Sequence, residues 1–527
     1  MTNAPDTVIH EETSAAIATP PNEQAVVEGA EQPRTPLPKF QLGLVMLIQF
    51  AEPITALVIY PFINQFVQAT GVTGGDDRKT GYYAGIIESA FFLAEAATVF
   101  YWGRLSDRIG RRPVLMIGPL GLTFAMLKFG YSKSFLSMVI SRCFQGVFNG
   151  NIGVSKTVMV ELTDETNIGD AFAMMPLMWS IGSTVAPIMG GGLSNPAERW
   201  PNVFGKMETF RSHPYFLPCL VSASIALISF VIAVLGFKET HPTLARSKSE
   251  EKDPIHDPEI SQVSSTDSLL GHNDSADYGT TSTRRSPSPS SSESSMDSCN
   301  RIGKLNSEAP TLSSILSSKK MQFIIINYLF LTFSDMAYSV LMPLIYSTKI
   351  EHGGLGLNPY QIGMTMGIWG FVNAFVQINL LGKLIRKYGS ARMYRYAYAS
   401  FCVCLLTYPV STYLARRNGG ISVGVCISIL VQLVFQFPLY MGYGAIHVVI
   451  AESSPKSILG SINGIVQMAG CTMRTVAPTI ASSLFSISLQ KRLLGGNFVY
   501  VVLYAVILVG VRSSLYLPER KKGTARL

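Results

Sequence analysis

Ionisable side chains interrupt several long apolar stretches of the sequence, and they are the residues best placed to do chemistry. Glu52, Glu95 and Asp335 each lie inside such a stretch. An ionised carboxylate in hydrocarbon costs about 2.5 kcal/mol or more, so each acid is expected to face a polar cavity or to carry a proton. Burial favours the neutral form of a carboxyl group, which suits it to proton transfer. We predict that these acids bind protons or substrate; pairing with a basic neighbour is the alternative for each.

Arg142 and Arg474 lie within other apolar stretches and supply the opposite charge. A guanidinium at such a depth needs a carboxylate partner or a watery cavity. Arg474 could therefore bind an anionic group of a substrate or form a structural ion pair. Gln145, Asn149 and Asn151 follow Arg142 in the same stretch, where their side chains could bind substrate or form hydrogen bonds between helices.

All of these residues lie in apolar blocks that are long enough to cross a membrane. Of the 527 residues, 48% are hydrophobic and 14% are charged, whereas a soluble domain carries about 25% charged residues. A helix of about 20 residues spans the roughly 30 Å of hydrocarbon in a bilayer. The sequence therefore predicts an all-α membrane protein with twelve transmembrane helices in contact with the lipid bilayer. The predicted helices are 40–67, 81–103, 113–131, 134–156, 170–193, 214–237, 321–347, 359–381, 394–414, 421–450, 458–487 and 497–517.

Basic residues gather in clusters between the apolar blocks, and these clusters predict the orientation of the chain. One cluster follows the second block, one follows the eighth, and one lies near the C-terminus. All three fall on the same side, which the positive-inside rule makes cytoplasmic. The net charge of +8 is thereby explained without nucleic acid as a partner. The clustered residues are Arg104, Arg108, Arg111, Arg112, Lys383, Arg386, Lys387, Arg392, Arg395, Arg520, Lys521, Lys522 and Arg526.

Three polar segments lie outside the predicted helices. Residues 1–38 contain no apolar signal-peptide core and are predicted to be a disordered cytoplasmic tail, and residues 518–527 form a second cytoplasmic tail. The Ser-rich segment 239–319 cannot bury enough apolar area to offset the entropy of ordering, so we expect a disordered cytoplasmic linker. This linker divides the chain into two six-helix bundles, 39–238 and 320–517.

The two halves repeat one pattern after their second helices, at 103–110 and 382–389. In each copy a glycine is followed by a leucine two residues later, by basic residues, and by a second glycine seven residues after the first. Gly103 would permit a close backbone approach, and Gly110 a tight turn. The first copy resembles the signature of the loop between helices 2 and 3 in the major facilitator superfamily. The resemblance implies a conformational latch, in which the aspartate contacts the start of helix 11 and releases it when the halves move. The latch residues are Gly103, Asp107, Arg108, Gly110, Arg111 and Arg112.

Other motifs resemble particular branches of this superfamily. Arg142 and Gln145 belong to a motif similar to one in its proton-coupled members. Pro61-Phe62 and the segment 460–478 resemble the fungal branch of twelve-spanning drug:proton antiporters. In the predicted fifth helix, small residues around a proline resemble the antiporter motif, with an alanine in place of the usual glycine. The small residues would allow the two halves to pack tightly. They form the set Gly182, Ala186, Pro187, Gly190 and Gly191.

The resemblance implies the major facilitator fold, in which two pseudo-symmetric bundles expose a central cavity to either side of the membrane in turn. It favours proton-coupled efflux of a small amphipathic molecule, such as a drug, toxin or secondary metabolite. We expect a monomer in the plasma membrane or the vacuolar membrane. A nutrient or metal-chelate transporter is one alternative, and a non-transporting sensor that signals through its linker is another.

Enzymatic functions are not indicated by the sequence. It contains no Gly-x-x-x-x-Gly-Lys-Ser/Thr phosphate loop, which argues against an ATP-driven pump, and no pair of nucleophile and base stands out within the blocks. The seven cysteines lack metal-ligand spacing, so we predict neither a metal site nor a cofactor. Phe371, Phe435 and Tyr440 could line an aromatic pocket, although most aromatic residues in membrane helices contact lipid or the protein core.

Overall fold

The computed structural model describes residues 35–164, 167–241, 317–454 and 459–519. These residues form helices joined by loops, and no strand occurs among them. Most of the predicted linker and of the two predicted tails lies outside the described residues.

The long helices correspond to the twelve predicted crossings, and the fourth crossing is made of two helices. The first half contains α1 (Lys39–Leu57), α3 (Thr80–Ile109), α4 (Arg111–Gly130), α5 (Phe135–Asn149), α6 (Ile152–Glu161), α7 (Ile168–Gly192) and α11 (Phe216–Gly236). The second half contains α15 (Lys319–Ser347), α16 (Pro359–Tyr388), α17 (Ser390–Asn418), α18 (Val423–Ser453), α19 (Leu459–Gln490) and α20 (Phe498–Ser514).

Two crossings are interrupted where the sequence disfavours a continuous helix. α1 ends at Leu57, the following break contains Pro61, which cannot donate a backbone hydrogen bond, and the chain resumes as the short helix α2 (Ile63–Ala69). α5 and α6 are separated at Gly150-Asn151, two residues of low helix propensity. Because α6 continues to Glu161, the fourth crossing is longer than the sequence predicted.

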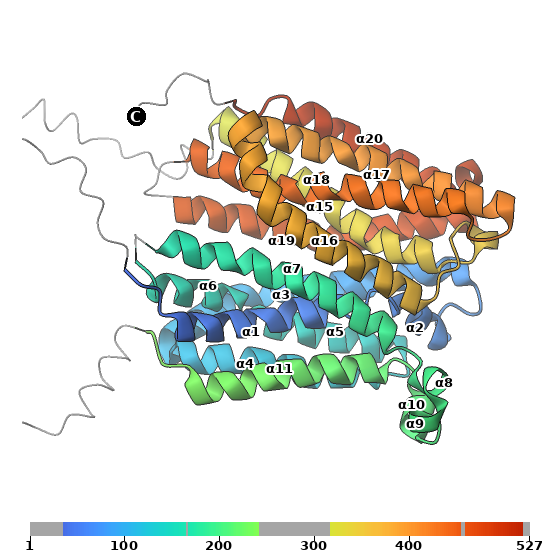
Figure 1. Ribbon diagram of the computed structural model, residues 1–527, viewed down its shortest axis with the longest axis horizontal. Coiled ribbons are helices and arrows are strands. Elements are labelled where there is room, and N and C mark those ends of the chain that lie inside the picture. The colour runs from blue at the N-terminus through green and yellow to red at the C-terminus, as the bar shows by residue number, and fades with distance from the viewer. Residues whose placement is uncertain (1–34, 165–166, 242–316, 455–458, 520–527) are drawn as a thin grey trace, which may run out of the picture.

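The helices form two bundles that lie side by side, one from each half of the sequence (Figure 1). Each bundle has its own buried core: Phe62, Val67 and Phe129 belong to the first, and Tyr394 and Tyr408 to the second. The first and last described residues lie at one end of the molecule, which we call the termini face. The opposite end, the loop face, carries the short helices α8 (Pro196–Arg199), α9 (Pro201–Phe204) and α10 (Glu208–Ser212).

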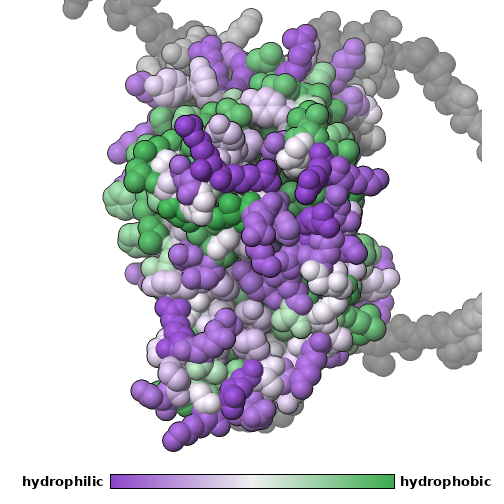
Figure 2. Space-filling view, turned by 90° about the vertical axis from the view of Figure 1, so that its right-hand side faces the viewer, coloured by the Kyte–Doolittle hydropathy of each residue, from purple (hydrophilic) through white to green (hydrophobic). Residues whose placement is uncertain are grey.

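Apolar side chains cover the sides of the bundles, as contact with lipid requires. On α16, Phe371, Phe375 and Ile378 are each about two-thirds exposed, and a soluble monomer rarely exposes a large continuous apolar surface. The loop face, seen end-on in Figure 2, is instead hydrophilic over its centre and over its lower projection. Eight of the described helices are long and apolar enough to cross a membrane. The chain is therefore an integral membrane protein.

Two long helix pairs make most of the contact between the halves: α3 packs against α19, and α7 packs against α16. Glycines bring α7 and α16 close, because a Cβ atom on Gly191 would lie 2.2 Å from the Pro359 carbonyl oxygen and one on Gly363 would lie 2.3 Å from that of Pro187. Backbones approach this closely only where side chains are absent. The small residues of the predicted fifth helix thus contribute to the interface between the halves.

Polar contacts between the halves lie toward the loop face. Asn64 donates a hydrogen bond to Ser347 at 2.9 Å, and Thr479 bonds Ser89 at 2.7 Å. Toward the termini face, a Cβ atom built on Gly103 of α3 would meet no atom within 4 Å, and the same holds for Gly464 of α19. The two halves are therefore closed together at the loop face and apart at the termini face.

Candidate functional site

Two acids of the first half lie near each other at the interface between the bundles. Glu52 comes from α1 and Glu95 from α3, and their carboxyl groups interact electrostatically. Asn149, at the end of α5, donates a hydrogen bond to Glu52 Oε1 at 3.2 Å. Lys156 of α6 interacts with both carboxyl groups. Four helices thus bring two acids, an amide and an amine together.

Arg474 of α19 supplies a guanidinium from the second half. It interacts electrostatically with Glu52, Glu95 and Asp335. Among the described residues it forms neither an ion pair nor a side-chain hydrogen bond, and its Nε atom is buried without a partner. In a structural ion pair, a guanidinium nitrogen would lie about 3 Å from a carboxylate oxygen. Arg474 is instead charged, partly buried and unpaired.

The depth of this cluster follows from the packing of α3 against α19. Ser89 and Thr479 are in contact, and the two helices run in opposite directions. Glu95 lies six residues beyond Ser89 and Arg474 five residues before Thr479, which corresponds to about 9 Å and about 7.5 Å along the helix axes. Both side chains therefore lie at a similar depth, immediately on the termini side of the closed contact between the halves.

Asp335 of α15 lies on the other side of Arg474. Tyr443 of α18 donates a hydrogen bond to Asp335 Oδ2 at 2.8 Å, while Oδ1 is buried without a partner. The ring of Tyr328 packs edge-on against Tyr443 and His447, with centroid distances of 6.4 and 5.6 Å. These aromatic side chains give the second half of the site an apolar wall with polar tips.

A second polar group lies in the first bundle and contains an ion pair, although the Nε atom of Arg142 and the amide nitrogen of Gln145 are buried without a hydrogen-bond partner. Arg142 forms an ion pair with Glu88 at 2.6 Å and donates a hydrogen bond to Gln145 at 2.7 Å. Tyr60 donates to the other oxygen of Glu88 at 2.8 Å, and the guanidinium lies 4.6 Å from the centre of the Phe91 ring. Arg142 and Gln145 are both fully buried. Of these two predicted candidates, Arg142 therefore contacts Glu88, and Gln145 contacts Arg142.

The three predicted polar candidates of the fourth crossing have different surroundings. Asn149 reaches Glu52, whereas Gln145 reaches Arg142. Asn151 lies at the helix break and packs against Gly118, where a Cβ atom would lie 1.8 Å from its Nδ2 atom. Asn151 and Gln49 line a small cavity beside Glu52, and each has a buried amide nitrogen without a partner. This cavity extends the polar surface around Glu52.

The predicted latch residues form contacts within the first half only. Arg111 forms ion pairs with Asp107 at 2.6 Å and with Glu161 at 3.0 Å. Gly110 has φ of 100°, a conformation that glycine adopts readily, and it joins α3 to α4. Gly103 has no close neighbour, and Arg108 is exposed. Residues 455–458, near the predicted partner of Asp107, lie outside the described residues.

Glu239 completes this network at the termini face. Its carboxylate accepts hydrogen bonds from the backbone N–H groups of Arg111 and Arg112 at 2.8 and 3.1 Å, and so caps the start of α4. Partial burial raises the pKa of Glu239, but backbone N–H groups of His241, Arg111, Arg112 and Thr240 outweigh that effect, so its pKa lies below its ordinary value.

The small residues of α7 contact both halves. Cβ atoms on Gly182 and Gly190 would collide with Pro53 and with the Val58 carbonyl oxygen, at 2.5 and 1.9 Å. Gly191 faces α16 instead, and Ala186 is fully buried. These glycines therefore allow α7 to pack closely against α1 on one side and against α16 of the other half on the other side.

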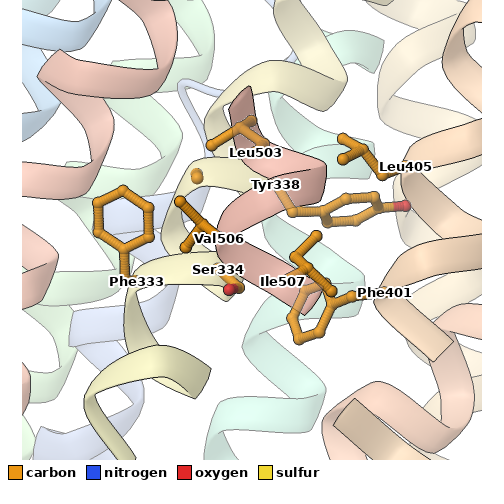
Figure 3. A pocket seen from close by; sticks show the side chains of 9 residues that line it. Phe333, Ser334, Tyr338, Phe401, Leu405, Leu503, Val506 and Ile507 are labelled. Carbon is orange, nitrogen blue, oxygen red and sulfur yellow. The ribbon is translucent and has the colours of Figure 1, made fainter. Parts of the chain in front are cut away.

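An apolar pocket lies apart from this site, inside the second bundle. Figure 3 shows it between α15, α17 and α20, with Phe333, Tyr338 and Phe401 among its lining residues. Of the aromatic residues suggested by sequence, Phe371 is exposed on the outer side of α16, so it does not line a pocket. Tyr440 packs against Trp369 with a centroid distance of 5.0 Å.

Sequence reasoning missed Lys156, Tyr443 and His447. Lys156 stood at the predicted end of the fourth block, where a lysine is expected to reach the membrane interface, but α6 extends beyond it to Glu161. Tyr443 lay in an apolar block without a charge to mark it. The intramembrane position of His447 was a usable signal, because such residues often mark functional sites.

Two helical bundles that carry ionisable groups to a shared interface within a membrane define a secondary transporter. The comparisons with known proteins agree with this class. The chain belongs to the Major Facilitator Superfamily, whose family model matches residues 45–478.

Curated relatives cover nearly the whole chain. The chain is 31% identical over 514 residues to the major facilitator-type transporter psiT2 of Psilocybe cyanescens, covering 94% of each chain. It is 28% identical to the major facilitator superfamily multidrug transporter mfsB of Aspergillus fumigatus, covering 86% of this chain and 79% of the relative. Among solved structures, a D-xylose-proton symporter matches with a TM-score of 0.64 at 13% identity, covering 91% of this chain and 98% of the other. The last likeness confirms the predicted fold.

Proposed function

We propose that this transporter exports a small amphipathic molecule in exchange for protons. One observation carries the proposal: Glu52 and Glu95 of one half face Arg474 of the other at the same depth, without an ion pair among the described residues. Charged groups within a membrane are costly unless they face a cavity or act on an ion or substrate. The names of the relatives, a multidrug transporter among them, support a small-molecule cargo.

Exchange follows from competition for the same carboxylates. When Glu52 and Glu95 are ionised, they hold the cargo and attract Arg474 across the interface. When protons neutralise them, both attractions weaken, and the cargo is released. Each ligand thereby lowers the affinity for the other, which is the linkage that a proton antiporter requires.

The predicted latch couples the site to the conformation of the halves. With both termini in the cytoplasm, the structure corresponds to the inward-open state, in which Asp107 contacts Arg111 of its own half. Closure of the termini face would bring Asp107 to the start of α19, where the helix dipole favours a negative charge. Opening at the loop face would separate Asn64 from Ser347 and Ser89 from Thr479.

The experiment is flux into sealed proteoliposomes under an imposed pH gradient, with a panel of amphipathic compounds. Glu52→Gln, Glu95→Gln and Asp335→Asn are each compared with the full-length wild type. We expect the gradient-driven flux of the two glutamine variants to be at least about tenfold lower than that of the wild type. Each substitution removes a hydrogen bond to an ionised carboxylate, which contributes roughly 1.5–3 kcal/mol. Thr472→Ala, an exposed position beside Arg474, is the matched control. Full gradient-driven flux in both glutamine variants would contradict the proposal.

A further inference from the structure

The central site holds opposite charges that face one another without forming an ion pair. Glu95 and Arg474 come from different halves and lie at a similar depth on α3 and α19. Neither forms an ion pair among the described residues, and Arg474 Nε is buried with no hydrogen-bond partner. An acid and a base that only stabilised the fold would be expected to meet. Arg474 therefore keeps hydrogen-bond donors that a bound molecule can use.

The surroundings of each charge select a different end of that molecule. On the side of the first half, Glu52 and Glu95 present two carboxyl groups, with Asn149 bonded to Glu52. Lys156 interacts with both carboxyl groups but forms no ion pair with either among the described residues, so the two carboxylates can still bind a cationic amine. On the side of the second half, Arg474 presents a guanidinium, which matches a carboxylate or phosphate through paired N–H donors.

Aromatic side chains of the second half lie beside Arg474. Tyr443 and Tyr328 lie close enough to Arg474 to interact with its charge, and the ring of Tyr328 packs edge-on against His447. Tyrosine and histidine rings can pack against an aromatic ring of a bound molecule, and their polar atoms can form hydrogen bonds with its polar groups.

We propose that the cargo is amphoteric, with a cationic amine held by Glu52 and Glu95, an anionic group held by Arg474, and an aromatic body between them. This substrate class rests on the proposed transport function and narrows it. A purely cationic drug would leave Arg474 without an anionic hydrogen-bond partner, since Asp335 forms no ion pair with it among the described residues, and a purely anionic one would add negative charge beside two carboxylates. An amphoteric molecule satisfies both halves at once, so it also draws them together.

Binding to the full chain in nanodiscs, without a pH gradient, tests this proposal. The probes are aryl amino acids whose amine and carboxylate are separated by one to five carbon atoms. Each is paired with the analogue that lacks the amine and the analogue that lacks the carboxylate. At least one amphoteric compound is expected to bind about tenfold or more tightly than both of its analogues, as two charge-assisted hydrogen bonds require. If no amphoteric compound exceeds both of its analogues, the proposal is wrong.

Variants of Glu95 and Arg474 test which residue binds the amine of the cargo and which binds its anionic group. Glu95→Gln should weaken the amphoteric compound to the level of its amine-free analogue and leave that analogue unchanged. Arg474→Gln should weaken it to the level of its carboxylate-free analogue, and Arg474→Lys should restore part of the loss. Equal weakening of all three compounds by either variant would overturn the assignment. Because no gradient is applied, these results are independent of the flux assay that tests proton exchange.

Discussion

In the first half, the chain turns from α3 into α4 at Gly110 with φ of 100°, and in the second half it turns from α16 into α17 at Gly389 with φ of 85°. In each half, a glutamate that follows the last helix binds near the start of the helix after this turn, α4 or α17. Glu239 accepts hydrogen bonds from the α4 backbone, and Glu519 accepts them from Arg392 and the neighbouring Arg395 of α17. The two termini-face corners thus share one design.

The interiors of the same helices differ. The register that aligns Gly103 with Gly382 places Gly367 and Ala374 of α16 where α3 has Glu88 and Glu95. α16 uses Gly367 to approach α7 closely, since a Cβ atom there would lie 2.2 Å from Ile188. The corners at the termini face are therefore alike in the two halves, whereas the two carboxyl groups of α3 have no counterpart on α16.

The largest expected change in the free energy of unfolding follows from breaking the buried ion pair inside the first bundle. Glu88→Gln leaves Arg142 fully buried without a counter-charge, which typically costs about 3–5 kcal/mol. Chemical unfolding in detergent measures this loss. The double variant Glu88→Gln/Arg142→Gln should recover part of it, because the unpaired charge is gone. A loss below about 1 kcal/mol in the single variant would show that water reaches Arg142.

The next prediction concerns the close packing of α7 against α16, which joins the two halves. Gly191→Ala places a methyl group against the backbone of α16, and overpacking of this kind costs about 1–3 kcal/mol. Gly192→Ala is the matched control, since a Cβ atom there meets nothing within 4 Å. We expect gradient-driven flux and thermal stability to fall in the first variant only. Equal behaviour of the two variants would mean that α7 and α16 do not pack this closely in the membrane.

A smaller effect compares the two glutamates at the termini face. The pKa of Glu239 lies below its ordinary value, so its stabilisation is fully present above the unfolded-state pKa of about 4.3 and is lost as pH falls through the lowered folded-state value. Glu239→Gln should therefore lower the unfolding temperature at pH 7, and this deficit should shrink as the pH falls and the carboxylate becomes protonated. Glu519→Gln, which removes a more exposed carboxylate, should change it less. A deficit for Glu239→Gln that persists at low pH would contradict this account.

The smallest effect concerns a loop-face contact between the halves. Lys349 pairs with Asp77 at 2.8 Å, but the lysine side chain is 67% exposed, and exposed pairs contribute little. Lys349→Ala should change flux by less than about threefold. Asp77→Lys/Lys349→Asp should match the wild type. A tenfold loss in the alanine variant would give the pair a larger role in closure than its exposure suggests.

The sequence predicted the fold well, because twelve apolar blocks and one repeated loop motif are strong local signals. It also pointed to Glu52, Glu95, Asp335 and Arg474 as charged residues within the apolar blocks, but it missed Lys156. It could not pair them, since the pairing depends on packing between distant helices: Arg142 meets Glu88 from another helix, and Arg474 meets no acid within ion-pair distance among the described residues.

The most direct measurement of the central claim is the distance between spin labels on opposite halves, in a cysteine-free full chain in nanodiscs. One pair, Arg104 with Lys387, lies at the termini face, and the other, Ala69 with Ile421, lies at the loop face; all four side chains are exposed. Adding cargo should shorten the termini-face distance and lengthen the loop-face distance, lowering the pH should oppose that change, and Glu52→Gln/Glu95→Gln should abolish the effect of pH. Distances that stay fixed, or that change in the same direction at both faces, would contradict a rocking motion about the central charges.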